Sequence, residues 1–247
     1  MNKIVKDFMQ ATAMENCSKP PQSLGVPQPP LVLPVNPGEA LTALPAPDSL
    51  TIGSIDLRTA VEARRTLRRY AETALTLEEL SYLLWLTQGV QEVTKRPSTL
   101  RTVPSAGARH AFETYLLVNR VTGLDAGLYH FASIDHALVR INTGSRDMNA
   151  EITRACHDQK QVASSAVTFI WAAVVERMTW RYVERGYRYL HLDAGHVCQN
   201  LYLAAEAVDS GVCAIAAFDD DLLNQALGFD GEKMFAIYLA SVGKKQS

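Results

Sequence analysis

The chain has 247 residues, 47% of them hydrophobic, a size and composition that fit one soluble globular domain with a substantial core. Its 24 Lys and Arg residues nearly balance 26 Asp and Glu residues, and the net charge of -2 excludes a field strong enough to recruit nucleic acid or an anionic membrane. The four cysteines form no Cys-x-x-Cys pair and no regular spacing, so no disulfide framework or zinc cluster is predicted. We therefore expect a cytoplasmic protein without nucleic-acid or membrane partners.

The N-terminal part is rich in proline. Nine of the eleven prolines fall between Pro20 and Pro47, in a segment with almost no charge and no helical or alternating period. We interpret residues 1–50 as a proline-rich N-terminal arm and residues 51–247 as the folded domain. The apolar run at residues 31–33 suits an arm that lies on the body or on a partner subunit, and a disordered tail is the alternative.

Two helices are predicted in the first part of the folded domain. The first begins near Asp56, whose carboxylate complements the helix dipole, and shows helical apolar spacing to Arg64. The second begins at Thr76, which forms a capping box with Glu79, and ends at Gly89.

Strands and helices are mixed in the rest of the chain. The predicted elements are strands at 112–118, 127–131 and 137–141, a helix at 148–157, a strand at 166–175, one long helix from 176 to about 209, a strand or connector at 213–217, a helix at 219–227 and a strand at 234–242. Asp219 or Asp220 is the expected N-cap of the helix at 219–227. The last strand is almost continuously apolar, as is typical of a strand covered on both faces. Strands and long helices without regular alternation favour a three-layer α+β fold over a doubly wound parallel sheet.

The segment Arg64-Arg65-Thr66-Leu67-Arg68-Arg69-Tyr70 carries four guanidinium groups and a hydroxyl where a helix gives way to extended chain. Alternate residues of an extended chain share a face, so Arg64, Thr66 and Arg68 would point the same way. Two forked donors and a hydroxyl on one face suit a phosphate and polar ligand edges. A solvated basic surface is the alternative.

A loop and a helix offer further candidates. In Pro104-Ser105-Ala106-Gly107-Ala108, small residues would let backbone amides approach a flat ligand, although a tight turn without a ligand would have the same sequence. On the long helix, His191, Asp193 and His196 point in different directions at 100° per residue, so we expect no metal site. Asp193 shares a stripe with Asn200, and both suit either a ligand or buried helix contacts.

No P-loop, Rossmann glycine motif, nucleophile elbow or His-Glu-x-x-His motif is present. A flavin enzyme needs none of them, because the flavin brings its own reactive atoms and the protein supplies binding, orientation and electrostatics.

Several segments, in this order, resemble one known family. Residues 64–70 resemble the Arg-Arg-Ser-x-Arg-x-Tyr opening of nitroreductase-like flavoproteins, with Thr66 in place of the commoner serine. Residues 104–108 look like the Pro-Ser-Ala-Gly-Ala loop of the SagB-type dehydrogenase branch, whose members oxidise thiazoline and oxazoline rings in peptides. Further matching segments are Leu192-Asp193-Ala194-Gly195-His196, Ala216-Ala217-Phe218-Asp219 and Val242-Gly243-Lys244-Lys245, so that the resemblance covers about residues 55–245.

The resemblance implies an FMN-dependent oxidoreductase of nitroreductase-like fold, with a mostly antiparallel central sheet flanked by helices, in a homodimer that shares two sites. In that family the opening arginines and the C-terminal basic residues bind the FMN phosphate, and the small-residue loop of the other subunit covers the flavin ring. The backbone at Ala216 and Ala217 would face flavin N5. The implied cofactor-binding residues are Arg64, Arg65, Thr66, Arg68, Pro104, Ser105, Ala106, Gly107, Asp193, Ala216, Ala217, Lys244 and Lys245.

Ring-oxidising members of the branch carry a Lys-Tyr pair, and Arg181-Tyr182 is the counterpart here. Arginine stays protonated near neutral pH and cannot act as the base, which leaves Tyr182 as the candidate proton donor or acceptor. Three functions stay open: an oxidoreductase acting on a small or peptide-derived substrate, a general NAD(P)H-dependent nitro- or quinone reductase, and a non-catalytic module that binds flavin or peptide. NADH or NADPH is the candidate electron donor.

Overall fold

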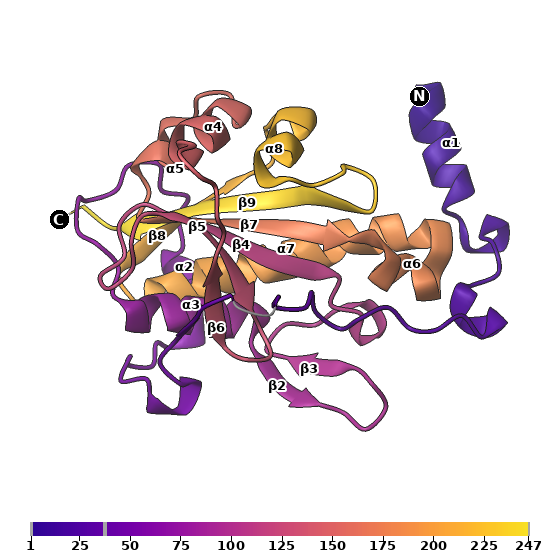
Figure 1. The fold of residues 1–247 in the computed structure, drawn as a ribbon, viewed down its shortest axis with the longest axis horizontal. Helices are drawn as coiled ribbons and strands as arrows, with labels where there is room; N and C mark the ends of the chain where they lie inside the picture. Colours follow the sequence, from indigo (N-terminus) through magenta and orange to yellow (C-terminus); the bar gives the residue numbers. More distant parts are fainter. Residues whose placement is uncertain (1, 37–38, 247) are drawn as a thin grey trace.

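The computed structural model describes residues 2–36 and 39–246, and its centre is a seven-stranded sheet (Figure 1). The strand order is β1-β6-β5-β4-β7-β9-β8, and every pairing described in this sheet is antiparallel. Its strands are β1 Leu41–Ala43, β4 Phe112–Val118, β5 Gly127–Ala132, β6 Ala137–Arg140, β7 Val167–Val174, β8 Ser210–Ile215 and β9 Met234–Lys244.

Helices cover both faces of this sheet, with α4, α5 and α8 above it and α3 and α7 below it in Figure 1. The helices of the folded domain are α2 Leu57–Ala63, α3 Leu77–Gln88, α4 Met148–Ala155, α5 Lys160–Ser164, α6 Val175–Tyr182, α7 Gly186–Glu206 and α8 Asp220–Leu227. The predicted three-layer α+β fold is thus confirmed.

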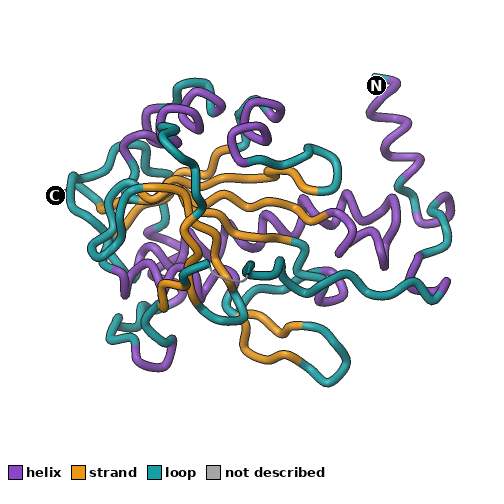
Figure 2. The backbone as a smooth tube through the Cα atoms, in the orientation of Figure 1, coloured by secondary structure: helices purple, strands orange, loops and turns teal. Residues whose placement is uncertain are grey.

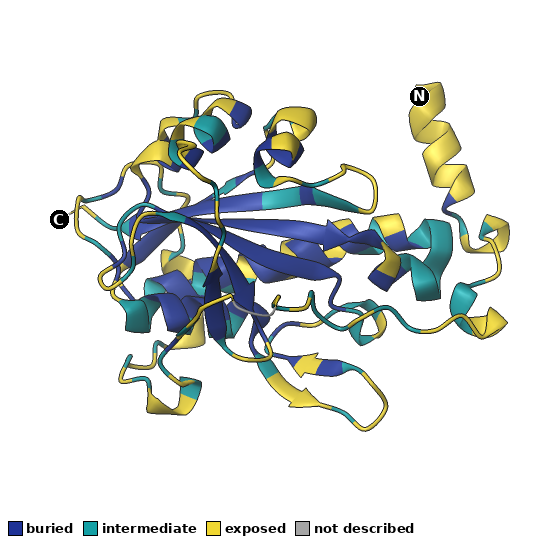
Figure 3. Cartoon of the chain, in the orientation of Figure 1, coloured by how far each residue is buried: buried dark blue, intermediate teal, exposed yellow. Residues whose placement is uncertain are grey.

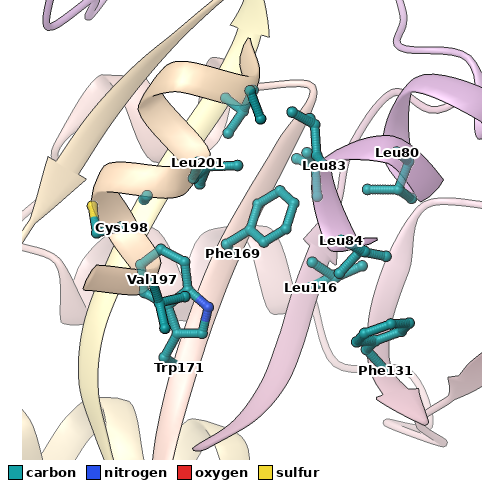
Figure 4. Close-up of a cluster of buried hydrophobic side chains, with 14 of the residues drawn as sticks. Leu80, Leu83, Leu84, Leu116, Phe131, Phe169, Trp171, Val197, Cys198 and Leu201 are labelled. Carbon is teal, nitrogen blue, oxygen red and sulfur yellow. The ribbon is translucent and has the colours of Figure 1, made fainter. Parts of the chain in front are cut away.

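Two apolar cores lie on the two faces of the sheet. Successive residues of a strand point to opposite faces, so Phe169 and Trp171 join the core under α3 and α7, whereas Ile170 and Ala172 join the core under α4 and α8. The first core is drawn in Figure 4, with side chains from α3, α7 and the central strands. Burial on both faces explains why the central strands are apolar at nearly every position.

The predicted helix starts are confirmed. The Asp56 carboxylate accepts from the Thr59 backbone N–H at the start of α2. Thr76 and Glu79 form both hydrogen bonds of the capping box of α3. Asp219 caps α8 by accepting from the Leu222 N–H, at 2.9 Å.

The prediction of one helix from 176 to about 209 is wrong, because the chain breaks between α6 and α7. Val183 has φ +43° and ψ -130°, a conformation that is unfavourable for a β-branched residue. The break is compensated by tertiary contacts: the Tyr182 ring packs edge-on against Tyr189, and Glu184 accepts hydrogen bonds from Ser18. Arg181 and Tyr182 therefore lie at the end of a separate short helix.

Several short elements were not predicted from the sequence: α5, the hairpin β2 Val90–Val93 and β3 Thr99–Arg101, β1, and the N-terminal helix α1 Lys3–Ala11. Helix α5 and the strands β1, β2 and β3 have only three to five residues, too few to show a clear period, whereas α1 has nine and lies in the segment interpreted as an arm. Helix α1 is amphipathic but exposed along its length (Figure 3). Strand β1 pairs with β6, so the segment assigned to the arm contributes an edge strand of the main sheet.

Residues 21–30 of the arm, a short 3-10 turn followed by irregular chain, run beside α6 (Figure 2). In the described ranges 2–36 and 39–246, no helix is long and apolar enough to cross a membrane.

Candidate functional site

The arginine-rich segment after α2 lies against the open side of β8. Thr66 forms a parallel bridge with Val212, and the Leu67 N–H donates to the Val212 carbonyl at 2.9 Å. Further along, Tyr70 packs on Gly243, where an added Cβ would lie 2.6 Å from the tyrosine ring. The close approach of the segment to the sheet thus requires glycine at this position.

Tyr202 of α7 holds this segment in place. Its buried hydroxyl lies 3.1 Å from the Thr66 hydroxyl and accepts from the Ala214 N–H at 3.0 Å. The Arg64 guanidinium lies over the Tyr202 ring, 5.3 Å from its centre. Arg64 and Thr66 therefore share a face, as expected for an extended segment, and Tyr202 is a further residue of the candidate site that the sequence did not indicate.

The other arginines of the segment differ in their surroundings. Arg65 donates to the carbonyl oxygens of Glu62 and Arg64, both at 2.8 Å, and so turns back on its own helix. Arg68 and Arg69 are exposed. Burial raises the pKa of the Cys213 thiol, and the Arg68 charge beside it opposes that rise. Arg68 therefore lies beside β8 with its charge open to solvent.

The Ala216-Ala217 pair follows the end of β8. Both residues are exposed, while the Ala217 carbonyl accepts from Gln159 Nε2 at 2.7 Å. The Asp219 N–H donates to the Ala155 carbonyl at 2.8 Å, which fixes the chain just beyond. The backbone at Ala216 is thus held at both ends and open to a ligand.

The two C-terminal lysines already have carboxylate partners. Lys244 pairs with Glu79 and donates to the Val208 carbonyl at 2.6 Å, whereas Lys245 lies 2.7 Å from Glu206. Their predicted contact with a phosphate stays a prediction, and it requires both lysines to exchange these partners.

The loop of residues 104–108 is tied to α7 through Asp193. The buried Asp193 carboxylate accepts from the Ser105 hydroxyl at 2.6 Å and from the Ala106 N–H at 3.2 Å. Burial raises the pKa of Asp193, and these two hydrogen bonds oppose the rise. Asp193 thus contacts the loop directly, so any effect on a ligand would pass through Ser105 and Ala106.

The same loop has an unusual backbone. Gly107 has φ +58°, and Ala108 and His110 also have positive φ, at +53° and +42°. A Cβ at Gly107 would collide with the Tyr182 hydroxyl and would lie 3.2 Å from Arg181 Nε. The structure therefore brings Arg181 and Tyr182 against the loop, in the same chain.

The sequence-predicted residues form two groups at opposite ends of α7. Asp193 belongs to the group with residues 104–107 and Arg181-Tyr182, and Tyr202 belongs to the group with the arginine-rich segment. These two residues are nine apart along α7, which at 1.5 Å per residue is roughly 14 Å. Among residues 2–36 and 39–246, no cluster of three His, Cys, Asp or Glu residues could hold a metal ion.

Tyr202 could have been found from a general rule. A tyrosine on the apolar side of a long helix needs a partner for its hydroxyl once it is buried. The sequence did not show which segment would supply that partner, because Thr66 lies 136 residues away.

We predict that His110 makes stability depend on pH. Burial, together with the charges of Arg101 and Arg109, lowers the pKa of His110 from 6.5 to about 3. The unfolded chain takes up a proton below pH 6.5 and the folded chain does not, so His110 lowers the free energy of unfolding by roughly 2 kcal/mol between pH 7 and pH 5. Urea unfolding at both pH values measures this loss. His110→Asn, which tolerates the positive φ, should reduce it, and an unchanged pH dependence would contradict the assignment.

Comparison with known proteins supports one family. The model of the Nitroreductase family matches residues 61–244. A Methanocaldococcus jannaschii protein named as a nitroreductase is 35% identical over 194 residues, which are 78% of this chain and 93% of that protein. The trifolitoxin-processing protein TfxB of Rhizobium leguminosarum is 29% identical over 133 residues, which are 53% of this chain and 36% of TfxB.

The fold of this chain is also similar to that of a protein of solved structure. The Escherichia coli microcin synthetase McbBCD complex, with truncated pro-MccB17 bound, contains a chain with a TM-score of 0.62 to this one at 18% identity. The match covers 99% of this chain and 92% of that chain. With the family model matching most of the folded domain, and with a relative covered almost completely, the chain belongs to the nitroreductase family.

Proposed function

We propose that the protein is an FMN-dependent oxidoreductase that moves a hydride through flavin N5 to or from a small or peptide-derived substrate. The observation that carries the proposal is the division of the candidate residues into two groups at the two ends of α7. One group offers basic side chains and exposed backbone, and the other offers a small-residue loop beside a tyrosine. Two chains related by a two-fold axis, with their α7 helices antiparallel, would bring the unlike groups of the two chains together.

The outward face of α7 supports such a homodimer. Leu192 is 60% exposed and Tyr187 is 38% exposed on this face. Gly195 lies in the interior of the helix, where glycine costs about 1 kcal/mol relative to alanine. A Cβ there would meet nothing within 4 Å in this chain, so a close partner surface would account for the glycine.

An apolar pocket beside α7 also supports a homodimer interface at this helix. It has a volume of about 240 Å³ and lies between α2, α3 and α7. Leu57 and Val61 of α2 are 69% and 50% exposed nearby. Apolar surface on three neighbouring helices is typical of a protein interface.

The donor set suits the FMN phosphate. Arg64, Thr66 and Arg68 supply two guanidinium groups and a hydroxyl, which match phosphate oxygens in charge and geometry. Lys244 and Lys245 already pair with carboxylates, so we assign the main phosphate contacts to the arginines. When bound, FMN would supply the atoms that accept and donate the hydride.

We assign separate roles to Arg181 and Tyr182. The Arg181 charge favours a developing negative charge on a ligand beside the loop, because a guanidinium stays protonated. The Tyr182 hydroxyl lies at the loop surface and can donate a proton to a substrate atom or accept one from it.

Two substrate classes remain, each with its own support. The likeness to a trifolitoxin-processing protein and to the McbBCD complex with its bound pro-peptide favours a peptide-derived substrate. Arg181, where ring-oxidising members carry lysine, and the relative named as a nitroreductase favour an NAD(P)H-dependent nitro- or quinone reductase.

We predict that Arg68→Ala weakens FMN binding roughly 10- to 100-fold, because a charge-assisted hydrogen bond to the phosphate is lost. Fluorescence titration of the apoprotein with FMN measures the dissociation constant. Arg69→Ala is the matched control, since Arg69 is equally exposed but points to the other side of the extended segment. Equal losses of FMN affinity in the two variants would indicate a general effect of positive charge and would contradict a specific contact of Arg68 with the phosphate.

We predict that Leu192→Asp weakens the dimer at least about tenfold, because it places a charge in an apolar interface. FMN affinity should fall with it, since each site would need both chains. Sedimentation velocity and flavin content measure the two effects. Leu222→Asp, on α8 across the sheet and 38% exposed, is the control and should change neither. A monomeric wild-type protein that binds FMN normally would contradict the shared site.

Anaerobic titration with NADH and NADPH tests the reaction. We predict that the flavin-loaded protein bleaches with at least one of them if it is a nitro- or quinone reductase. In that case, Tyr182→Phe should leave the bleaching unchanged. If neither donor bleaches the flavin, the peptide-derived substrate class is favoured, and Tyr182→Phe should lower turnover without lowering flavin content. Flavin binding without turnover for any donor and acceptor would indicate the non-catalytic module.

A further inference from the structure

The arm crosses α6 along a row of side chains that recognise its main chain. Trp180 Nε1 donates to the Val26 carbonyl at 2.8 Å, and Arg177 Nε donates to the Pro30 carbonyl at 2.8 Å. Farther along, the Leu33 N–H donates to the Glu113 carboxylate, also at 2.8 Å. We call Trp180, Arg177 and Glu113 the α6 track.

None of these three contacts depends on an arm side chain. Prolines at positions 27, 29, 30 and 34 keep the arm extended and leave its carbonyl groups free to accept. A surface that binds an extended peptide through its main chain can accept other sequences with the same backbone. The track therefore has the properties of a peptide-binding site.

The arm leaves part of this site unused. Arg177 Nη1 and Arg101 Nη2 are buried and have no hydrogen-bond partner in the described parts of the chain. Both residues are more than nine-tenths buried, at 4% and 8% exposure. An unsatisfied buried donor is costly, so these two N–H groups would gain from an added acceptor.

The charges around these donors favour an anionic acceptor. Arg177 Nη2 lies 2.6 Å from the Glu113 carboxylate, which also contacts the His130 ring at 2.7 Å. Arg101 has no ion pair within the described residues and donates instead to the Gln88 side chain. Burial and the nearby Arg177 charge together lower the pKa of Arg101 to about 10, although the Glu113 charge opposes the fall. A carboxylate on a bound peptide would balance the second positive charge.

The track also connects to the loop of the proposed active site. Arg109 lies over the Trp180 ring, 5.3 Å from its centre, and its Nε donates to the Gly107 carbonyl at 3.1 Å. Trp180 directly precedes Arg181 at the end of α6. A peptide on the track would therefore pass beside the candidate catalytic pair.

We propose that the α6 track is a docking site for an extended peptide that carries a carboxylate, and that the arm fills this site within its own chain. The arm then competes with such a peptide and limits its access to the site. The consequence for turnover rests on the proposed oxidoreductase function, whereas the binding itself does not.

The test uses a labelled synthetic peptide with the sequence of residues 24–36 and the full-length protein, with fluorescence anisotropy as the readout. Leu33→Pro removes the N–H that donates to Glu113, so it weakens the arm and leaves the track intact. We expect this variant to bind the peptide about tenfold more tightly than the wild-type protein does, because a hydrogen bond to a charged group is lost only in the competing arm.

Two further variants complete this experiment. Val35→Pro is the control, because the Val35 N–H makes no hydrogen bond within the described residues, and it should bind the peptide as weakly as the wild type. Adding Trp180→Phe to Leu33→Pro removes the donor to Val26 and should weaken binding several-fold. Equal binding by Leu33→Pro and Val35→Pro, or no effect of Trp180→Phe, would overturn the proposal.

The carboxylate is tested with two altered peptides, one with Leu31→Glu and one with Val32→Glu. Neighbouring residues of an extended chain point to different sides, so one of the two should reach the unpaired guanidinium groups. That peptide should bind Leu33→Pro more tightly than the unaltered peptide does. If neither does, the carboxylate preference is wrong. The readout needs no flavin chemistry, so failure here is distinct from failure of the proposed oxidoreductase function.

Discussion

Polar side chains on α7 must find hydrogen-bond partners once the helix packs on the sheet, since a buried donor or acceptor left unpaired costs about 1–3 kcal/mol. Asp193 finds the loop at Ser105 and Ala106, and Tyr202 finds Thr66 and the backbone of β8. Asn200 donates to the Leu86 carbonyl at 2.9 Å. The contacts of Asp193 and Tyr202 fix the loop at Ser105 and the extended segment at Thr66, whereas the Asn200 contact joins α7 to α3. The helix thus stabilises the core and positions both groups of candidate site residues.

The same contacts make irregular backbone tolerable. Positive φ at Ala108 and His110 is unfavourable for residues with a Cβ, and so is the conformation of Val183. The first two lie in the loop that Asp193 holds, and the third lies between α6 and α7, where Tyr182 meets Tyr189. Strain of this kind persists only where the surrounding structure determines it. Its position beside Arg181 and Tyr182 fits a site in which a few side chains must be aimed accurately.

The N-terminal arm also contacts the helix that carries Arg181 and Tyr182. Its main chain meets α6 on the track formed by Trp180, Arg177 and Glu113, while Arg109 joins that track to the loop. The proposed site and the arm therefore share one helix. The contacts that would let the arm compete with a peptide also hold α6 in place. Displacing the arm would therefore change both the access of a peptide to the track and the position of α6.

The sequence by itself determined the elements whose signals are local. The caps at Asp56, Thr76 and Asp219 depend on residues within one helical turn, and the central strands depend on apolar runs, so these predictions and the α+β fold class were confirmed. Candidate site residues could be proposed from ordered motifs, but the way in which they group in space could not. Only the tertiary structure decided the break at Val183, the partner of Asp193 and the path of the arm. The physical reason is that each depends on contacts between segments far apart in the chain, such as Ser105 with Asp193, and such contacts leave no periodic signal in the sequence.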